Sequence, residues 1–342
     1  MKQSAGKPQL PKGFTLIELM IAMTVGLFIL GAVSAVAINS GRNARANDRT
    51  SELQTNGRYA LDVIRRDVQH AGQSGLMPST TLQQAASSVF TIASGVAVLP
   101  AGTGTVADCA PQFALQLQQP VFGIDDQSGT PNPYSATCIP TANYARGDIL
   151  AVRYADMANE WPVTIASAAS APAAALTNDI FFRSSYSASS LFQKGGSTPY
   201  RVVTDPVQDQ LLRTFVYYIS PYTTTVNDGI PALWRVNLVA GAMTPELVAS
   251  GIDNMQVRYG VVDSSGNTQY LDASAISATS WPLVQSVRIW LLARNSNSER
   301  NEAYVNNTEY SPTTNPMGNL ASLVPNDKYR RQLYMTTISL RN

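Results

Sequence analysis

The feature that most constrains this chain is a long apolar stretch near the N-terminus with one carboxylate at its head. Residues 19–38 read LMIAMTVGLFILGAVSAVAI and contain no charge and no proline. Because an α-helix rises about 1.5 Å per residue, roughly 20 apolar residues span the ~30 Å hydrocarbon layer of a membrane. Glu18 directly precedes the stretch, and a carboxylate there costs on the order of 2.5–3.5 kcal/mol unless it has a partner. The sequence therefore predicts a membrane-length helix whose single carboxylate is paired.

The residues around Glu18 carry a second pattern. The first 13 residues hold three lysines and no acid, and the run from Gly13 reads GFTLIELM. This combination resembles the processing signal of type IV pilins and type II secretion pseudopilins. The resemblance implies leader cleavage between Gly13 and Phe14, N-methylation of Phe14, and an assembly role for Glu18, the fifth residue after that cleavage. In that family the glutamate pairs with the N-terminal amine of a neighbouring subunit, and such a pair attracts strongly in low dielectric.

Two other interpretations of the N-terminus remain open. An uncleaved membrane anchor accounts for the apolar stretch but not for Glu18. A conventional secretory signal peptide is the closer rival, since Ala35-Val36-Ala37 fits a small-residue cleavage site and would release a periplasmic protein starting at Ile38. The apolar core of such a peptide normally has about 7–15 residues and no charge, so the length of this stretch and Glu18 favour the pilin signal.

The charge balance argues against nucleic acid as a partner. Without the three leader lysines, 21 of the 24 basic residues remain against 23 acidic ones. A chain with a slight excess of acidic residues has no general attraction for a phosphate backbone. We therefore expect no nucleic-acid binding.

The two cysteines, Cys109 and Cys138, are predicted to form a disulfide. An even pair in an extracytoplasmic domain most often does so, and closing a loop of about 30 residues contributes roughly 3–4 kcal/mol in the chain-entropy model. A metal site is the alternative, but the one histidine, His70, is far away in the sequence and the ligand spacing is missing. The intervening segment is rich in proline and glycine, so it is expected to be irregular.

The segment after the apolar stretch is predicted to continue the helix with one apolar face. No proline occurs between Phe14 and Met77. Apolar or small residues recur mostly at spacings of three and four, which is the pattern of an amphipathic helix: Leu53, Gly57, Ala60, Leu61, Ile64, Val68 and Ala71. The charged residues Arg58, Asp62, Arg65, Arg66 and Asp67 are predicted to form a solvated face with i,i+4 pairs, and Gly72, Gly75 and Pro78 to end the helix.

The remainder is predicted to be a β-rich head. Runs rich in Val, Ile, Tyr and Trp alternate with Gly, Pro, Asn and Ser clusters, which is typical of strands. The expected strands lie within 147–154, 200–204, 211–220, 233–239, 255–262, 284–293 and 332–340. The Ala/Ser-rich stretch 166–175 is expected to be a surface excursion. The predicted fold class is α+β, with the long helix packed on a mostly antiparallel β head: leader 1–13, membrane-spanning or filament-core helix 14–38, amphipathic continuation 39–75 and head 76–342.

Several segments of the head resemble PilW-type minor pilins. They are Asn56 to Ala60, Gly147-Asp148 with Arg153-Tyr154, Gly251 to Gly260, Val287 to Arg294, and the closing Leu340-Arg341-Asn342. This resemblance implies a minor pilin that primes assembly at the tip of a type IV pilus. It also implies other minor pilins, the major pilin, a prepilin peptidase/N-methylase and a large tip adhesin as partners. The protein would lie in the inner membrane with its head in the periplasm, and at the pilus tip after assembly. A J-type pseudopilin of type II secretion remains the alternative, which the phenotype of a deletion distinguishes.

No catalytic motif is evident. The sequence contains no GxSxG elbow, P-loop or HExxH motif, and any nucleophile system based on histidine would have to use His70. Asp125-Asp126 lies in a loop and offers the hard oxygens that calcium prefers, but it lacks the alternation of an EF-hand. A solvated turn is therefore favoured there. We expect no enzymatic activity, no cofactor and no metal.

Overall fold

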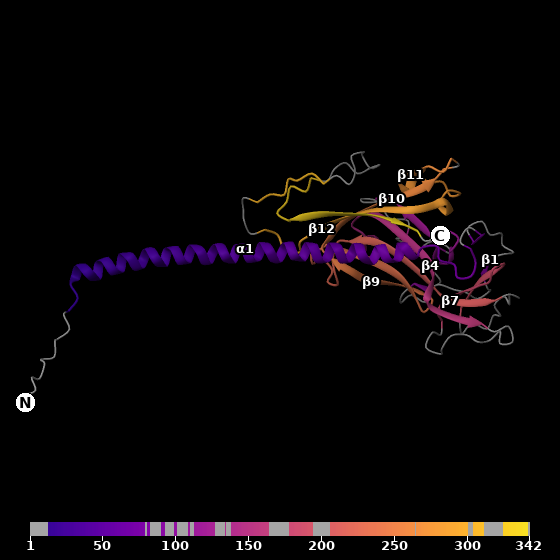
Figure 1. Cartoon of the computed structure of the whole chain (residues 1–342), viewed down its shortest axis with the longest axis horizontal. Coiled ribbons are helices and arrows are strands. Elements are labelled where there is room, and N and C mark those ends of the chain that lie inside the picture. The colour runs from indigo at the N-terminus through magenta and orange to yellow at the C-terminus, as the bar shows by residue number, and fades with distance from the viewer. Residues whose placement is uncertain are drawn as a thin grey trace, which may run out of the picture. The chain divides into compact units, whose positions relative to one another are not determined.

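One long helix precedes a β-rich region in the computed structural model of this chain (Figure 1). The structure describes residues 13–78, 81–82, 90–92, 99–100, 109, 113–126, 134, 138–163, 178–193, 206–263, 265–299, 304–310 and 324–340. The chain divides into two compact units, Met1–Ser51 and Glu52–Asn342. The predicted leader lies outside the described residues except for Gly13. The predicted strand at 200–204 and the Ala/Ser stretch 166–175 lie entirely outside them.

Helix α1 (Leu16–His70) begins directly after Thr15, a residue type that often caps the N-terminus of a helix. Within the first unit its large apolar side chains are exposed, and they include Leu27 (70 % exposed) and Phe28 (82 %). The helix is therefore apolar on all sides there and is long and apolar enough to cross a membrane.

The later part of α1 belongs to the second unit and has one buried face. The buried positions Leu53, Gly57, Ala60, Ile64 and Val68 recur at spacings of three and four, as the sequence predicts. The helix ends at His70 because Gly72 (φ 83°) and Gly75 (φ 61°) take left-handed backbone conformations that glycine adopts without a steric cost.

The larger sheet has nine strands. Its central strand β7 (Val207–Ser220) pairs with β4 (Arg146–Val163) on one side. On the other side β5 (Ile180–Ser184) and β8 (Ala232–Val239) pair with different parts of it. These pairs are antiparallel. The remaining strands are β1 (Phe90–Ile92), β2 (Leu99–Pro100), β3 (Val121–Ile124), β6 (Ser189–Gln193) and β9 (Ala242–Ser250), of which β1 and β2 pair in parallel with β6 and β9.

The smaller sheet is antiparallel throughout and has the order β11–β10–β12–β13. Its strands are β10 (Ile252–Val262), β11 (Thr268–Leu271), β12 (Val284–Arg294) and β13 (Arg331–Ser339). Four short 3₁₀ turns among the described residues lie between strands: Phe113–Leu115, Thr141–Asn143, Ala273–Ala275 (η5) and Trp281–Leu283 (η6). The last carries the buried Trp281.

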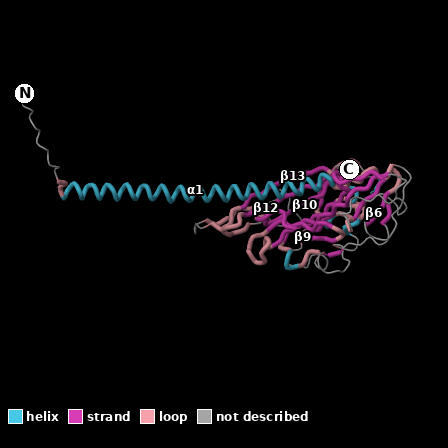
Figure 2. Tube along the Cα trace, turned by 90° about the horizontal axis from the view of Figure 1, so that it is seen from below, coloured by secondary structure: helices cyan, strands magenta, loops and turns pink. Residues whose placement is uncertain are grey.

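The main hydrophobic core lies where the later part of α1 meets both sheets. Ile64 and Val68 of the helix share this cluster with Phe215 of the larger sheet and with Ile289 and Ile338 of the smaller one. Figures 1 and 2 both show β12 beside this part of α1. A second cluster, which includes Leu212, Val216 and Phe182, fills the space on the other face of the larger sheet. The predicted α+β fold, a long helix on mostly antiparallel sheets, is confirmed.

Six of the seven predicted strands are present, and the seventh falls outside the described residues. Five of the six lie within a few residues of their expected bounds, whereas β4 continues to Val163, well beyond the predicted end at residue 154. The other described strands, β1, β2, β3, β5, β6, β9 and β11, were not predicted. One prediction for the helix is wrong: Asp67 does not lie on a solvated face but is 6 % exposed. Of the two predicted helical charge pairs, Arg66 pairs with Asp62 at 3.1 Å, whereas no ion pair between Arg58 and Asp62 is present among the described residues.

Candidate assembly site

The first turn of α1 holds Glu18 in a reciprocal hydrogen-bonded arrangement. Thr15 is the residue before the helix, and its backbone N–H and Oγ1 both donate to Glu18 Oε2 at 2.9 Å. The backbone N–H of Glu18 donates in return to Thr15 Oγ1 at 3.3 Å. This is a capping box, in which two otherwise unsatisfied N–H groups of the first turn gain acceptors. Thr15 was not singled out as a site residue, although the spacing Thr-x-x-Glu is readable in the sequence.

The surroundings of Glu18 are apolar and exposed. Phe14 is 91 % exposed, and the following helical side chains Leu16 and Ile17 are 78 % and 66 % exposed. Burying one such side chain is worth about 1.5–3 kcal/mol, so a helix with this surface requires lipid or other helices around it. Within one chain, the N–H and hydroxyl of Thr15 donate hydrogen bonds to the Glu18 carboxylate. Each carboxylate oxygen can accept more than one hydrogen bond, so Glu18 can also bind a donor from another chain.

Asp67 anchors the later part of α1 on the larger sheet through a buried polar network. Tyr217 donates a short hydrogen bond to Asp67 Oδ2, and Arg235 Nη1 lies 3.0 Å from the same oxygen. Tyr154 donates to Oδ1 at 3.4 Å. Burial raises the pKa of Asp67 above its ordinary value, and the donors from Tyr217 and Arg235 oppose this shift. The network ties the helix to β4, β7 and β8, and no sequence pattern indicated it.

An open pocket of about 470 Å³ lies beside this network, between α1 and the strands β4, β7, β8 and β9. Its lining includes three arginines and three acids: Arg66, Arg213, Arg235, Asp67, Asp156 and Glu246. Arg213 pairs with Asp156 at 3.1 Å, and Arg235 pairs with both Asp67 and Glu246. Because the charges balance and are mutually paired, the pocket has no net attraction for an anionic ligand.

Asp148 joins the two sheets. Its carboxylate accepts a hydrogen bond from the backbone N–H of Asp126 at 3.0 Å and another from Val257 in β10 at 2.7 Å. Burial raises the pKa of Asp148 well above its ordinary value. Gly147 has φ +84°, and a Cβ there would lie 2.7 Å from the carbonyl oxygen of Met255. The Gly-Asp pair is thus explained by the close approach of β4 to β10.

The predicted turn at Asp125-Asp126 is structural and not simply solvated. Asp125 accepts hydrogen bonds from the backbone N–H groups of Ala273 (2.8 Å) and Ser274 (2.9 Å), at the start of the 3₁₀ turn η5. A carboxylate that accepts two N–H donors is poorly placed for a cation. Among the described residues no group of three or more His, Cys, Asp or Glu side chains is placed to hold a metal ion.

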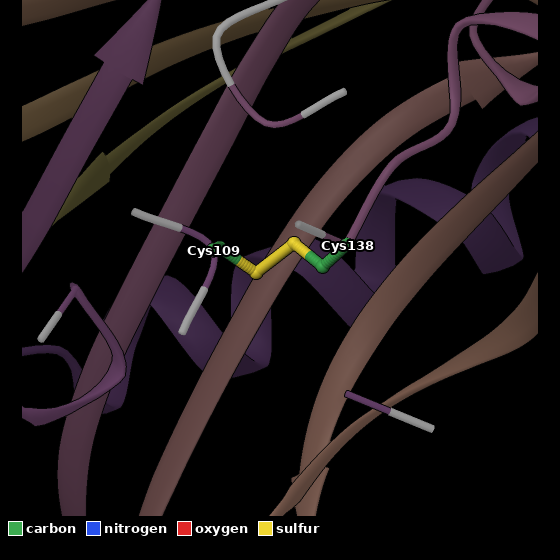
Figure 3. The surroundings of a disulfide bond; sticks show 2 residues. All are labelled: Cys109 and Cys138. Atoms are coloured by element: carbon green, nitrogen blue, oxygen red, sulfur yellow. A yellow bond between two sulfur atoms is a disulfide. The ribbon is translucent and has the colours of Figure 1, made fainter. Parts of the chain in front are cut away.

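Cys109 and Cys138 form a disulfide, as Figure 3 shows. Their Cα atoms are 5.2 Å apart and the cysteines are separated by 29 positions in the sequence. Cys109 is fully buried in the second hydrophobic cluster, against which Cys138 also packs. The disulfide therefore closes a loop of chain that includes the 3₁₀ turn Phe113–Leu115 and strand β3. The prediction that this segment is irregular is wrong for these two elements. His70 lies at the end of α1, where its Nδ1 is 2.7 Å from the carbonyl oxygen of Arg66.

Comparisons with known proteins bear on both ends of the chain. Residues 11–34 match the model of the prokaryotic N-terminal methylation motif, and residues 216–342 match the model described as type IV pilus-assembly protein W. Among solved structures, a type IV-like pilin from Thermus thermophilus is similar at 14% identity, over 57% of this chain and 78% of that one, with a TM-score of 0.25. A comparison with curated proteins finds no match.

Proposed function

We propose that this chain is a type IV minor pilin of the PilW type that primes pilus assembly from the tip, which the matches of residues 11–34 and 216–342 support. A prepilin peptidase removes the leader after Gly13, and Phe14 is then N-methylated. The mature protein waits in the inner membrane, held by residues 14–38. It then joins other minor pilins and the major pilin, with a large tip adhesin as a further partner. No enzymatic activity is proposed.

The observation that carries this proposal is the capping box at the head of an exposed apolar helix. Cleavage after Gly13 would place a charged amine on Phe14, next to Thr15 and one helical turn from Glu18. In lipid, both this amine and the Glu18 carboxylate are costly to leave unpaired. When a subunit joins a filament, it meets the N-terminus of a neighbouring subunit. The Glu18 carboxylate of one subunit can then pair with the Phe14 amine of the other, so the cost of leaving each charge unpaired in lipid is offset only on assembly.

The decisive first experiment is the N-terminal mass of the mature protein from cells with and without the prepilin peptidase. The proposal requires a peptide that begins at N-methylated Phe14 and is present only when that peptidase is present. A start at Ile38 would identify a conventional signal peptide and would remove any role for Glu18.

The role of the charge is tested by two substitutions at Glu18. Glu18→Val should leave leader removal intact and abolish incorporation into pili. Glu18→Gln is the matched control, because its amide oxygen still accepts the hydrogen bonds of Thr15 but carries no charge. Loss of incorporation in both variants assigns the role to the charge, whereas normal incorporation of Glu18→Gln would refute the pairing.

The tip position and the kind of filament are tested separately. Antibodies against the head should label the ends of sheared pili and not their sides. Deletion of the gene should abolish twitching and leave exoprotein secretion normal; the opposite phenotype would identify the pseudopilin alternative. The match of residues 216–342 to the PilW model supports the pilus over the secretion filament.

A further inference from the structure

The strand β13 forms one edge of the smaller sheet, and no described strand pairs with its outer side. Leu340 N donates to Gln285 O at 2.9 Å and Asn295 N donates to Arg330 O at 3.1 Å, at the two ends of the β12–β13 pair. Bonded and non-bonded residues alternate in an antiparallel pair, so the even-numbered residues of β13 bond to β12. The odd-numbered residues therefore point their N–H and C=O groups away from the sheet.

The outward backbone groups of four of these residues have no partner among the described residues, although the Thr337 hydroxyl accepts a hydrogen bond from Arg288 Nε at 3.2 Å. The carbonyl oxygen of Arg331 accepts a hydrogen bond from Tyr310 at 3.3 Å, but the backbone groups of Leu333, Met335, Thr337 and Ser339 have none. Their N–H and C=O groups form an unfilled ladder about 20 Å long. The side chains of these four residues share one face, on which Met335 is 61 % exposed.

Among the described residues, the edge strands β1, β3, β9 and β11 carry features that protect against strand addition. Strands β1, β3 and β11 are only three or four residues long. Beyond its contact with β2, the edge strand β9 carries Pro245 and Glu246, and its pairing with β8 contains a register shift. Short length, proline, charge and irregular pairing are the devices that prevent edge-to-edge association.

After Arg331, its first residue, β13 has none of these devices. It is nine residues long, its pairing with β12 runs without a register shift, and residues 332–340 contain no charge and no proline. On a soluble, monomeric protein such an edge promotes aggregation, and it is tolerated where another chain covers it. Peptide segments that add to a sheet edge gain affinity from main-chain hydrogen bonds and specificity from alternate side chains.

From this geometry we propose that β13 receives an extended, uncharged strand from a neighbouring pilus subunit, which adds to the smaller sheet beside Leu333 to Ser339. Leu333 to Ser339 carry no charge, so a charged side chain buried beside Leu333 or Met335 would lack a counter-ion, which favours an uncharged strand. The guanidinium of Arg288, bonded to Thr337 Oγ1, lies at the other end of this segment. An apolar side chain of the incoming strand would cover Met335. The choice of a pilus subunit as the source rests on the proposed function, whereas the open edge does not.

A second copy of this chain is a poorer occupant. If two copies of this chain paired through β13, the two strands would run antiparallel about a two-fold axis. Every element that runs along β13 in one copy would then point in the opposite direction in the other copy. Tyr334 of β13 contacts Gly57 and donates to Leu53 O at 3.1 Å, so the later part of α1 lies along this strand. The two helices would then run in opposite directions. Subunits of a filament are joined by heterologous contacts without such an axis.

The test is site-specific photo-cross-linking of the full chain in cells that make the pilus. A benzophenone amino acid is placed at Met335 or at Thr337, with the exposed Leu283 of η6 as the control position. We expect both edge positions, and not the control, to cross-link to one pilus subunit. Mass spectrometry should place the two cross-linked residues of that subunit two positions apart, as a ladder requires.

Blocking variants test the backbone contacts. Met335→Pro removes an outward N–H and leaves the bonds to β12 in place, so the cross-link from Thr337 should fall about tenfold, or about 1.4 kcal/mol. Met335→Lys serves if the proline variant does not accumulate, and Met335→Leu is the matched control that should keep the cross-link.

Adducts to a second copy, to lipid or to scattered positions would overturn the proposal, as would an unchanged yield in the blocking variants. If the proposed function is wrong but a strand does add at β13, the result differs from these outcomes. The unmodified chain would then be absent from pili, while a strand added at β13 would still give paired cross-links to a protein that is not a pilus subunit.

Discussion

Substituting Gly57 by alanine tests whether the close approach of α1 to β13 defines the fold. A Cβ at this position would lie 2.3 Å from Tyr334 Cε2 and 2.7 Å from Cδ2, which are distances that real Cβ atoms do not adopt. The ring cannot simply swing away, because Tyr334 Oη donates to the carbonyl oxygen of Leu53 at 3.1 Å.

Two opposing effects set the magnitude of this change. Alanine is better than glycine inside a helix by about 1 kcal/mol. Overpacking of a well-packed contact costs typically about 1–3 kcal/mol. Gly57→Ala should therefore lower the free energy of unfolding by about 1 kcal/mol, against the direction that helix propensity alone predicts.

The double mutant makes the test specific. With Tyr334→Ala in place, the clash is absent and Gly57→Ala should raise the free energy of unfolding by about 1 kcal/mol, which is a coupling of about 2 kcal/mol. The assay is chemical unfolding of the full chain in detergent micelles, followed by tryptophan fluorescence. Gly41→Ala is the control, because nothing lies within 4 Å of its Cβ. A stabilising Gly57→Ala in the otherwise unchanged protein would refute the packing argument.

Three further predictions concern the second unit, each measured by unfolding of the full chain in micelles. Replacing Cys109 and Cys138 by serine should lower the free energy of unfolding by about 3 kcal/mol, and an equal stability of the reduced and oxidised protein would contradict this. Asp148→Ala should cost about 3 kcal/mol because it leaves two buried N–H groups without acceptors, and a neutral result would show that water replaces the carboxylate. The raised pKa of Asp67 adds stability that is complete below pH 3.8 and is lost as the pH rises through the folded-state pKa. Asp67→Asn should therefore lose less stability than the unmodified protein between acidic and neutral pH, and parallel pH profiles would count against the assignment.

The sequence pattern was sufficient to predict features that depend only on residues a few positions apart. The apolar stretch, the stripe of Leu53 to Val68 and the glycines that end α1 were all readable, because helix burial and capping depend on spacings of a few residues. Most of the long strands were found for the same reason. The capping box between Thr15 and Glu18 was also available in the spacing but was overlooked.

Asp67 shows where this reasoning stops. It belongs to a run of charged residues that reads as a solvated helix face, yet it is buried beneath Tyr217 and Arg235. Those partners lie 150 and 168 positions away in the sequence. A sequence pattern of period 3.6 reports the average direction of a face, and it carries no information about which distant side chains meet at its margin.

The sequence by itself determined the N-terminal processing signal, the membrane-length helix, its change to a one-sided apolar face, and a β-rich head with one disulfide. Each of these depends on the order and spacing of nearby residues. Only the tertiary structure decided that Asp148 bridges two sheets, that Gly57 admits Tyr334, and that β13 ends a sheet with an open edge. The pairing of strands and the burial of single polar groups depend on contacts between residues far apart in the sequence, from 37 positions for Arg294 and Arg331 to 109 for Asp148 and Val257, and neither composition nor periodicity encodes them.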